Sequence, residues 1–442
     1  MENTMYAGFH CVEVQPPLGL NIPGYYRARY AEGTADPLYL RAAAFSCGEE
    51  KAVIFNCESI GIRTAAFDMV KKKVAEVCGI SEDAVFINCV HSHTSYRILP
   101  AGDDMDALDI FLLRLYRQFA DCAKLAFNDL KPCTISYAAG EAKNIAFVRR
   151  YRMKDGTVRT NPPKGDPNIA GPIDCPDEQV RLIRIQREGA KEILMVHFGT
   201  HADMIGGTFF SPDWPGYLVK TLDRALDDEV HTMFLLGAEG NCGTRNPMSN
   251  EPRPPKGVGL AKSFARKVAG AVLRVYDSAK PVASDTLRVA HKYVQVGKNA
   301  YDPAKLPMVE ELVKIYRERG EKDPELNKYP DLHYREALRI KANLARPEFF
   351  NLRISGVRIG DIAFIGIPGE PFASIGLDIV AKSTMPMTVV TACTNGHEGY
   401  YPDAQAYKEP GYSYEKATSP FAANCAEVLI NGAMDVLAVL NK

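Results

Sequence analysis

The chain has 442 residues, of which 46% are hydrophobic and 24% are charged, and these proportions are typical of a globular protein with a sizeable core. Its 53 Lys and Arg residues balance 54 Asp and Glu residues, so no overall field attracts nucleic acid or an anionic membrane surface. The 11 cysteines include no CxxC pair, which argues against a disulfide framework and against a cysteine zinc knuckle.

Strand and helix patterns alternate from the first part of the chain onward. Residues 51–59 and 84–90 are short apolar runs rich in strand-forming residues. Residues 63–78 and 108–127 have the periodicity of amphipathic helices. This order predicts layers of helices and sheets.

Two consecutive strand patterns, residues 178–187 and 192–200, flank the turn sequence EGAKE. They predict an antiparallel hairpin inside the sheet, so the sheet is expected to be mixed. The alternation then continues through four elements: a helix from Trp214, a strand at 231–237, a helix at 257–276 and a strand at 286–296.

The polar and charged stretch 303–348 has helical periodicity and predicts a helical insertion over the body of the protein. Five elements follow it: strands at 351–360 and 361–368, a helix from Pro371, a strand at 387–394 and a closing helix from Ser419. We therefore predict an α/β fold with mixed, partly antiparallel β-sheets flanked by helices. Residues 1–442 are expected to form a single large domain.

The N-terminal sequence MENTMYAGFH has neither the basic region nor the apolar region of a signal peptide. No run approaches the roughly 18 apolar residues that a membrane span needs. Together with the scattered cysteines, these features predict a cytoplasmic protein without an integral membrane segment. They do not predict an oligomeric state.

The first candidate for chemistry is the segment VHSHT, where an apolar strand pattern ends in His91 and His93. Alternate residues of an extended chain point to the same side, so both imidazoles are expected to face one cleft at the strand end. One of them could bind a metal while the other acts beside it. An HxH pair is found in structural or exposed positions about as often as in functional sites. The pair alone therefore does not establish a metal site.

A second strand pattern ends in histidine within the segment VHFGTHAD. His201 follows the strand, and Asp203 lies within reach of a role behind a metal ligand. His197 lies inside the apolar run, where a core histidine is the favoured interpretation. The next segment, GGTFFSPDWPGY, is rich in Gly and Pro and predicts a rigid loop.

Two further segments follow strand patterns near the C-terminus. In IPGEPF, Glu370 stands where the next helix should begin, so it is either a metal ligand or an acid held by the first-turn amides. The segment TNGHEGYYPDAQAYKEPGYSYE is dense in Gly and Tyr and is either a functional loop or a simple lid.

Together, the four segments place two histidines, a carboxylate and a tyrosine at the ends of four strands. Zinc accepts such nitrogen and oxygen ligands. The chain contains no GxSxG elbow, no GxGxxG after a strand, no Walker sequence and no HExxH, so serine-hydrolase, nucleotide-binding and zincin interpretations lack support.

These segments, in this order, resemble the neutral, non-lysosomal ceramidase family, specifically its catalytic N-terminal domain. VEVQPPLGLNIPGYYRA is similar to its proline-rich Gly-Tyr signature, VHSHT to its THTHSG segment and FGTHAD to its HPTS segment. SPDWPGY is similar to SGDNKGY, IPGEPF to IPGEP, and NGHEGYYPDAQAYKEPGY to a Tyr-rich loop. The six matches span nearly the whole chain.

Carried over position by position, the resemblance implies a set of site residues. It implies that zinc is held by four residues: His91, His201, Glu370 and Tyr400. It implies three catalytic residues: His93 beside the water on the metal, Arg149 near the substrate carbonyl with Arg150 as its neighbour and alternative, and Tyr412 with Tyr414 as the alternative.

The chain departs from the family pattern in two places. Where the family has a segment like GNxSPN with a catalytic serine, this sequence reads GNCGTRNP, with Gly243 at the serine position and Thr244 next to it. The chain also ends where the family's C-terminal immunoglobulin-like domain would begin, so that domain is expected to be absent.

We therefore predict a zinc-dependent amidohydrolase that cleaves the carboxamide bond of an N-acyl compound with metal-activated water. The substrate is either ceramide or a small non-lipid N-acyl amine or ester. A metal-stabilised binding protein without turnover is the alternative from another class, and Gly243 is the feature that supports it. No nucleic-acid partner is expected.

Overall fold

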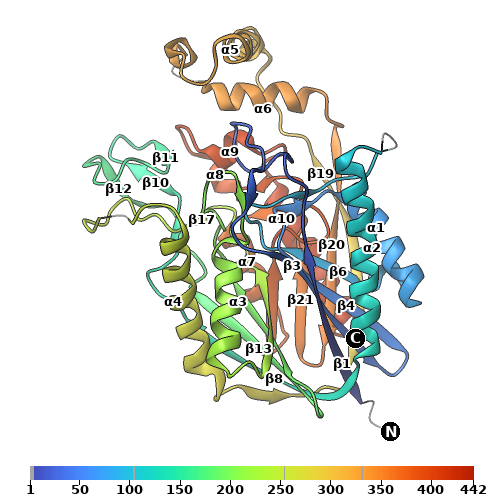
Figure 1. Cartoon of the computed structure of the whole chain (residues 1–442). Coiled ribbons are helices and arrows are strands. Elements are labelled where there is room, and N and C mark those ends of the chain that lie inside the picture. The colour runs from blue at the N-terminus through green and yellow to red at the C-terminus, as the bar shows by residue number, and fades with distance from the viewer. Residues whose placement is uncertain (1–3, 103–104, 253, 330–331) are drawn as a thin grey trace.

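Two β-sheets packed face to face form the centre of the computed structural model, which describes residues 4–102, 105–252, 254–329 and 332–442 (Figure 1). The larger sheet has nine strands. They run in the order β16 (Val230–Leu236), β14 (Glu192–Phe198), β13 (Gln179–Arg187), β8 (Lys131–Glu141), β1 (Met5–Val14), β3 (Leu38–Cys47), β4 (Glu50–Cys57) and β6 (Val85–Cys89), and β18 (Lys280–Val282) pairs with β8.

The smaller sheet has four strands. They are β19 (Leu287–Gly297), β20 (Phe349–Ile359), β21 (Ile362–Gly366) and β23 (Met387–Thr391). Three strand pairs, β4 with β6, β14 with β16 and β21 with β23, are parallel, and the other pairs in these two sheets are antiparallel. The predicted mixed sheets are thus confirmed, as is the hairpin of β13 and β14.

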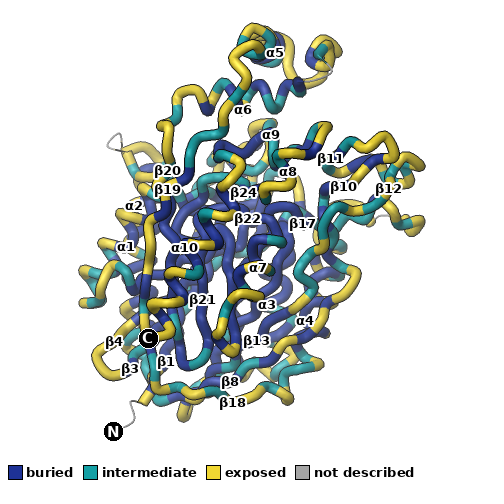
Figure 2. The backbone as a smooth tube through the Cα atoms, turned by 180° about the vertical axis from the view of Figure 1, so that it is seen from behind, coloured by how far each residue is buried: buried dark blue, intermediate teal, exposed yellow. Residues whose placement is uncertain are grey.

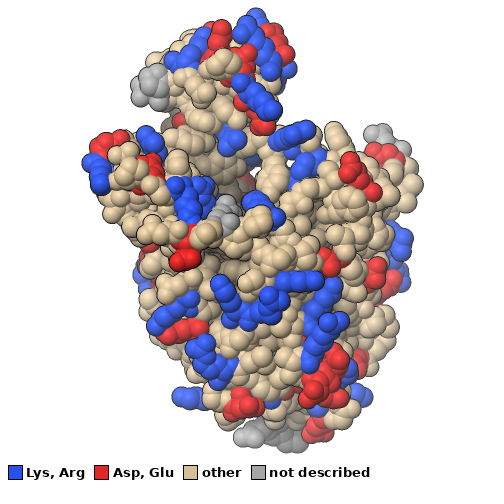
Figure 3. Space-filling view, turned by 60° about the vertical axis from the view of Figure 1, so that its left-hand side comes forward, with Lys and Arg blue, Asp and Glu red and all other residues tan. Residues whose placement is uncertain are grey.

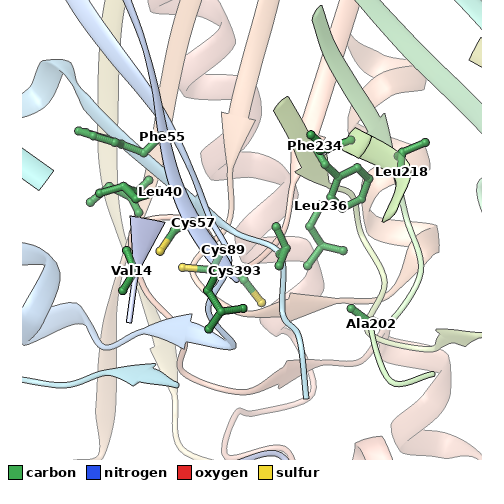
Figure 4. Packing of buried hydrophobic residues seen from close by; sticks show 14 of the residues in the cluster. Val14, Leu40, Phe55, Cys57, Cys89, Ala202, Leu218, Phe234, Leu236 and Cys393 are labelled. Carbon is green, nitrogen blue, oxygen red and sulfur yellow. The ribbon is translucent and has the colours of Figure 1, made fainter. Parts of the chain in front are cut away.

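Helices cover the outer face of each sheet. Over the larger sheet lie α1 (Thr64–Cys78), α2 (Ala107–Asn128), α3 (Asp213–Ala225) and α4 (Val258–Tyr276), and over the smaller sheet lie α7 (Ala373–Lys382) and α10 (Cys425–Leu440). Figure 4 shows part of the core beneath the first group, with Leu218 of α3 beside Phe234. The predicted helix-flanked α/β architecture is confirmed.

Strand β4 shows why its sequence is apolar almost throughout. Val53 and Phe55 belong to the core under the helices, whereas Ala52 and Ile54 belong to the core between the two sheets. Alternate side chains of a strand point to opposite faces, so a strand covered on both faces needs a continuous apolar run. In Figure 2 the central strands are accordingly buried.

The stretch predicted as a helical insertion forms a helical cap, by which we mean the described residues between 303 and 348. Its elements are η2 (Pro303–Lys305), α5 (Leu306–Arg319), η3 (Pro324–Asn327) and α6 (Tyr334–Leu344). A separate apolar cluster that includes Leu312 and Ile340 holds it together. The cap stands above one end of the sheets, where the loops described below converge (Figure 1).

Short elements complete the described structure. They are β2 (Gly33–Thr34), β5 (Gly61–Ile62), η1 (Glu82–Ala84), β7 (Arg97–Ile98), β9 (Phe147–Val148), β10 (Arg150–Met153), β11 (Val158–Thr160), β12 (Ile169–Pro172), β15 (Phe209–Phe210), β17 (Cys242–Gly243), β22 (Glu370–Pro371), β24 (Tyr400–Tyr401), α8 (Ala404–Lys408) and α9 (Tyr414–Thr418). All 11 cysteines are free, as their scattered positions predict. Within the described ranges, no helix has both the length and the apolarity that crossing a bilayer requires.

Candidate metal centre

The four predicted ligands come together at one end of the two sheets. His91 follows β6 and His201 follows β14, so both lie just beyond the carboxyl ends of strands with a parallel neighbour, which is where clefts form in α/β sheets. Glu370 and Tyr400 are direct partners in the parallel pair β22 and β24. Backbone pairing therefore fixes the separation of two of the four.

The ligand atoms of these residues lie within contact of one another. Glu370 Oε2 lies 3.4 Å from His91 Nε2 and 3.2 Å from His201 Nε2. Tyr400 Oη lies 3.4 Å from His201 Nε2. Both histidines and the glutamate are buried, and Tyr400 is half-buried. The geometry is that of a small enclosed cluster of nitrogen and oxygen donors.

Hydrogen bonds at the far side of each ring fix the tautomers. His91 Nδ1 lies 2.8 Å from the carbonyl of Ile60, and His201 Nδ1 lies 3.0 Å from the carbonyls of Glu239 and Cys242. A carbonyl only accepts, so Nδ1 of each ring carries the proton. The Nε2 atom of each ring then faces Glu370. For His91, burial opposes protonation, but the charge and the hydrogen bond of Glu370 help to raise the pKa of the ring.

This arrangement could hold a cation. Burial, followed by the charge of Arg149, lowers the pKa of His201 to about 4, so its ring is neutral near pH 7. Its Nε2 lone pair and the buried carboxylate oxygen Oε2 of Glu370, which accepts no hydrogen bond from the described residues, face each other across 3.2 Å. A positive ion lying against both acceptors would relieve their repulsion, and zinc accepts both atom types.

Three further side chains, which the sequence analysis did not name as ligands, reach the cluster. His397 Nε2 lies 3.0 Å from Glu370 Oε1, and Glu239 and Cys393 complete groups that could hold a metal with His91. Burial raises the pKa of Glu239 to about 8, against the opposing charge of His91. His397 lies in the Gly- and Tyr-rich segment that follows β23, so that segment was the sequence signal that could have found it. No sequence pattern marked Glu239.

His93 does lie beside His91, with its Nε2 3.2 Å from His91 Nε2, but the expected reason is wrong. Strand β6 ends at Cys89, and His91 has a φ of 61°, which is not extended. Strain of this kind costs about 1–3 kcal/mol and persists where surrounding contacts impose it. Here the His91 amide donates to Ser59 and the His93 amide to Ala202.

The surroundings of His93 are built from the N-terminal Gly-Tyr segment. Asp203, which was expected behind a ligand, accepts hydrogen bonds from Tyr25 and, at 2.7 Å, from Lys256. Burial alone would raise the pKa of Asp203, but the charge and the hydrogen bond of Lys256 help to hold it low. Gly24 has a φ of 106°, and a Cβ there would lie 2.7 Å from His93 Nδ1. The segment thus approaches the ring too closely for any side chain at that position.

Of the two neighbouring arginines, the structure brings Arg149 to the cluster. Its Nη1 lies 3.4 Å from His201 Nε2, its Nη2 donates to the Gly240 carbonyl at 2.6 Å, and its Nε lies 3.0 Å from Glu415. Arg150 points the other way and binds the buried carboxylate of Glu409. Adjacent residues of extended chain point to opposite sides, so only one of them can face the metal centre.

We expect Arg150→Met to reduce stability rather than to alter the site. Removing one partner of a buried ion pair leaves a buried charge uncompensated, and the free energy of unfolding should fall by about 3 kcal/mol in denaturant titration. Arg152→Met is the control, because Arg152 contacts the same Glu409 from an exposed position and should cost less than about 1 kcal/mol. Equal losses in the two variants would contradict the structural role of Arg150.

The two candidate tyrosines also separate. The Tyr412 ring stacks on His333 of the helical cap at 4.5 Å and lines a second cavity, away from the metal centre. Tyr414 lines the same pocket as His91, and its ring lies 5.8 Å from that of Tyr400. The structure thus places the alternative, Tyr414, beside the cluster.

Gly243 belongs to the short strand β17, and its backbone lies next to the Arg149 side chain. A Cβ at this position would meet the Arg149 side chain at 3.6 Å, an ordinary contact, so the backbone site has room for a Cβ. Among the described residues that line the pocket, Thr244 does not occur.

Comparison with known proteins finds no matching family model and no curated protein with a matching sequence. Solved structures do match. A neutral ceramidase from Pseudomonas aeruginosa superposes with a TM-score of 0.72 and 14% sequence identity, over 100% of this chain and 75% of the other. A ceramidase complexed with C2 matches with the same TM-score and identity, over 99% and 75%. The chain therefore has a neutral ceramidase-like fold.

Proposed function

We propose that this chain with the ceramidase-like fold is a zinc-dependent amidohydrolase that cleaves the amide bond of an N-acyl compound. The observation that carries the proposal is the close approach of His201 Nε2 and Glu370 Oε2, 3.2 Å apart and both acceptors, with His91 and Tyr400 against them. The fold adds support, because a solved protein that shares it is a neutral ceramidase.

The residues present suit zinc. Two imidazole nitrogens, a carboxylate oxygen and a phenolic oxygen are ligands that zinc accepts. A zinc ion held by them would supply Lewis-acid activation of water and of the amide carbonyl near neutral pH. The alternative ligand group formed by His91, His93 and His201 would use nitrogen only and would leave Glu370 Oε2 without a partner.

The chain's own groups supply the remaining steps of the hydrolysis. Burial keeps the pKa of His93 well below its usual value, so the ring is neutral and its position beside His91 allows it to accept a proton from the attacking water. The Arg149 guanidinium, fixed by Glu415 and Gly240, offers positive charge to the carbonyl oxygen as charge develops on it. A new C–O bond replaces the C–N bond, and His93 returns the proton to the leaving amine.

Metal analysis combined with an activity assay tests this proposal. We expect about one zinc per chain in protein purified without added metal, and release of amine from N-acyl amides that a chelator abolishes and zinc restores. Activity that resists removal of the metal would overturn zinc dependence. Full zinc occupancy with no turnover on any acyl amide or ester would instead favour the binding protein without catalysis.

We expect His397→Ala to weaken zinc binding without abolishing it. His397 holds Glu370 Oε1 at 3.0 Å and so orients the carboxylate that would bind the ion. Loss of such an orienting partner typically weakens metal affinity by about 10–100-fold, which a competition titration with a chelator measures. His397→Gln keeps a donor and should recover part of the affinity, and an unchanged dissociation constant in His397→Ala would remove the orienting role.

We expect Gly243→Ser to fold normally and to change kcat by less than about threefold, equivalent to well under 1 kcal/mol. A Cβ has room beside Arg149, and the proposed nucleophile is water, which needs no hydroxyl at this position. Gly243→Ala controls for the added Cβ. A gain of about 100-fold specific to the serine would show that the protein lacks a group that the reaction needs.

A further inference from the structure

The pocket over the metal centre is strongly cationic. It has a volume of about 310 Å³, and His91, His93 and Glu370 are among its lining residues. Four arginines also line it: Arg63, Arg97, Arg339 and Arg346. Figure 3 shows Lys and Arg side chains around the hollow between the helical cap and the body. Glu370 and Glu398 are the carboxylates in the described lining, so the positive groups outnumber them.

Most of these arginines lack a carboxylate partner. Within the described part of the chain, only Arg63 of the four forms an ion pair, a loose one with Glu398 at 3.8 Å. Arg339 and Arg346 lie over the rings of Tyr26 and Phe350, at 5.7 and 5.9 Å. These aromatic contacts leave the positive charges uncompensated.

Arg97 is the clearest case. It projects from β7 into the pocket, and its buried Nε has no hydrogen-bond partner among the described residues. Burial and then the charge of Arg63 lower its pKa to about 10, with a further contribution from Arg339 that Glu370 opposes. A buried donor without an acceptor is costly and is normally explained by a ligand or ion.

The apolar lining is correspondingly small. Among the described lining residues, Ile60 is the one branched aliphatic side chain, and the rest are mostly arginine, asparagine, histidine, acidic, tyrosine or proline residues. Long alkyl chains bind where many aliphatic and aromatic carbons can exclude water. This pocket does not offer that surface above the metal centre.

We propose that the substrate of this site is a small N-acyl compound that carries an oxyanion, a carboxylate or a phosphate, bound by Arg97 together with Arg63, Arg339 and Arg346. The guanidinium fork pairs with either group through two parallel hydrogen bonds. Two of the four arginines belong to the helical cap, so the cap supplies part of the anion site. The cleavage of an amide bond in this inference rests on the proposed function. The anion site is argued independently, from the arginines that line the pocket.

Matched substrates test this inference on the zinc-loaded protein. N-Butanoyl-β-alanine carries a carboxylate, N-butanoyl-O-phosphoethanolamine carries a phosphate, and N-butanoyl-propylamine is neutral. We expect kcat/KM for at least one anionic compound to exceed that of the neutral one by about tenfold or more, as a single charge-assisted contact provides. The better anion identifies the group, and long-chain ceramide in mixed micelles should react more slowly than either.

Arg97→Gln should remove most of this preference. We expect it to lower kcat/KM for the preferred anionic compound by about tenfold or more and to change the neutral compound by less than about threefold. Arg346→Gln should also lower kcat/KM for the anionic compound. It replaces Arg97→Gln as the test variant if Arg97→Gln does not fold. Arg317→Gln is the matched control, because Arg317 is exposed on α5 of the same cap and does not line the pocket.

The outcomes separate this inference from the proposed function. Hydrolysis of the neutral amide or of ceramide at equal or higher rates, unaffected by Arg97→Gln, would overturn the anion site and leave the amidohydrolase standing. If no compound is hydrolysed, calorimetric binding of the two anionic compounds decides. Binding that Arg97→Gln weakens by about tenfold supports the anion site and refutes the hydrolase, and absence of binding refutes the anion site.

Discussion

Replacing His91 by alanine should remove the metal and the activity together. His91 contributes one of the Nε2 atoms that face Glu370, and its own Nδ1 is held by the Ile60 carbonyl. Without this ring, the metal site proposed around Glu370 and His201 loses one of its two imidazole ligands. Lewis-acid activation is worth several kcal/mol, so kcat/KM should fall by about 10³-fold or more.

The measurement is zinc content by elemental analysis beside the rate of amine release. His10→Ala is the control, since His10 lies on β1 outside the cluster and should change neither quantity. Heat or denaturant unfolding of each variant separates loss of metal from loss of fold. A folded His91→Ala protein that keeps one zinc per chain would refute the assignment of His91 as a ligand.

The second large effect is expected from His93→Ala, which should keep the metal and lose turnover. His93 Nε2 lies 3.2 Å from His91 Nε2, whereas the carboxylate faces His91 and His201. If His93 transfers a proton rather than binding the ion, its removal should lower kcat by about 10²–10⁴-fold and leave zinc stoichiometry unchanged.

This variant also decides between two possible ligand groups. His91, His93 and His201 lie close enough to form an all-histidine group. Loss of zinc in His93→Ala would favour that group and would contradict the role proposed for Glu370. Retention of both zinc and full turnover would exclude His93 from the chemistry. Asp203→Asn serves as the matched control, because it alters the polar surroundings of His93 and keeps the ring.

The positions of His91, His201 and Glu370 after strands could be read from the sequence because apolar runs identify strands and the polar residue after such a run lies at the end of a sheet. Alternation of helices and strands likewise predicts the mixed α/β fold, which the structure confirms. These are local properties. The amphipathic pattern of 303–348 similarly predicts its helices.

Tertiary packing decided between candidate site residues that are only one or two positions apart in the sequence. Arg149 and Arg150 have the same chemistry, but the direction of each depends on the pairing of β9 with β17, which places Arg149 toward His201 and Arg150 toward Glu409. In the same way, the fold of the C-terminal loop places Tyr414 in the pocket and stacks Tyr412 on His333. No local pattern encodes such directions.

The sequence by itself determined which segments are strands and helices and which polar residues follow them, because each depends on the order of apolar and polar residues over short distances. Only the tertiary structure decided that His397 supports Glu370 and that arginines from β7 and from the helical cap surround one pocket. These groups are far apart in the chain, and their approach depends on how the two sheets and the cap pack.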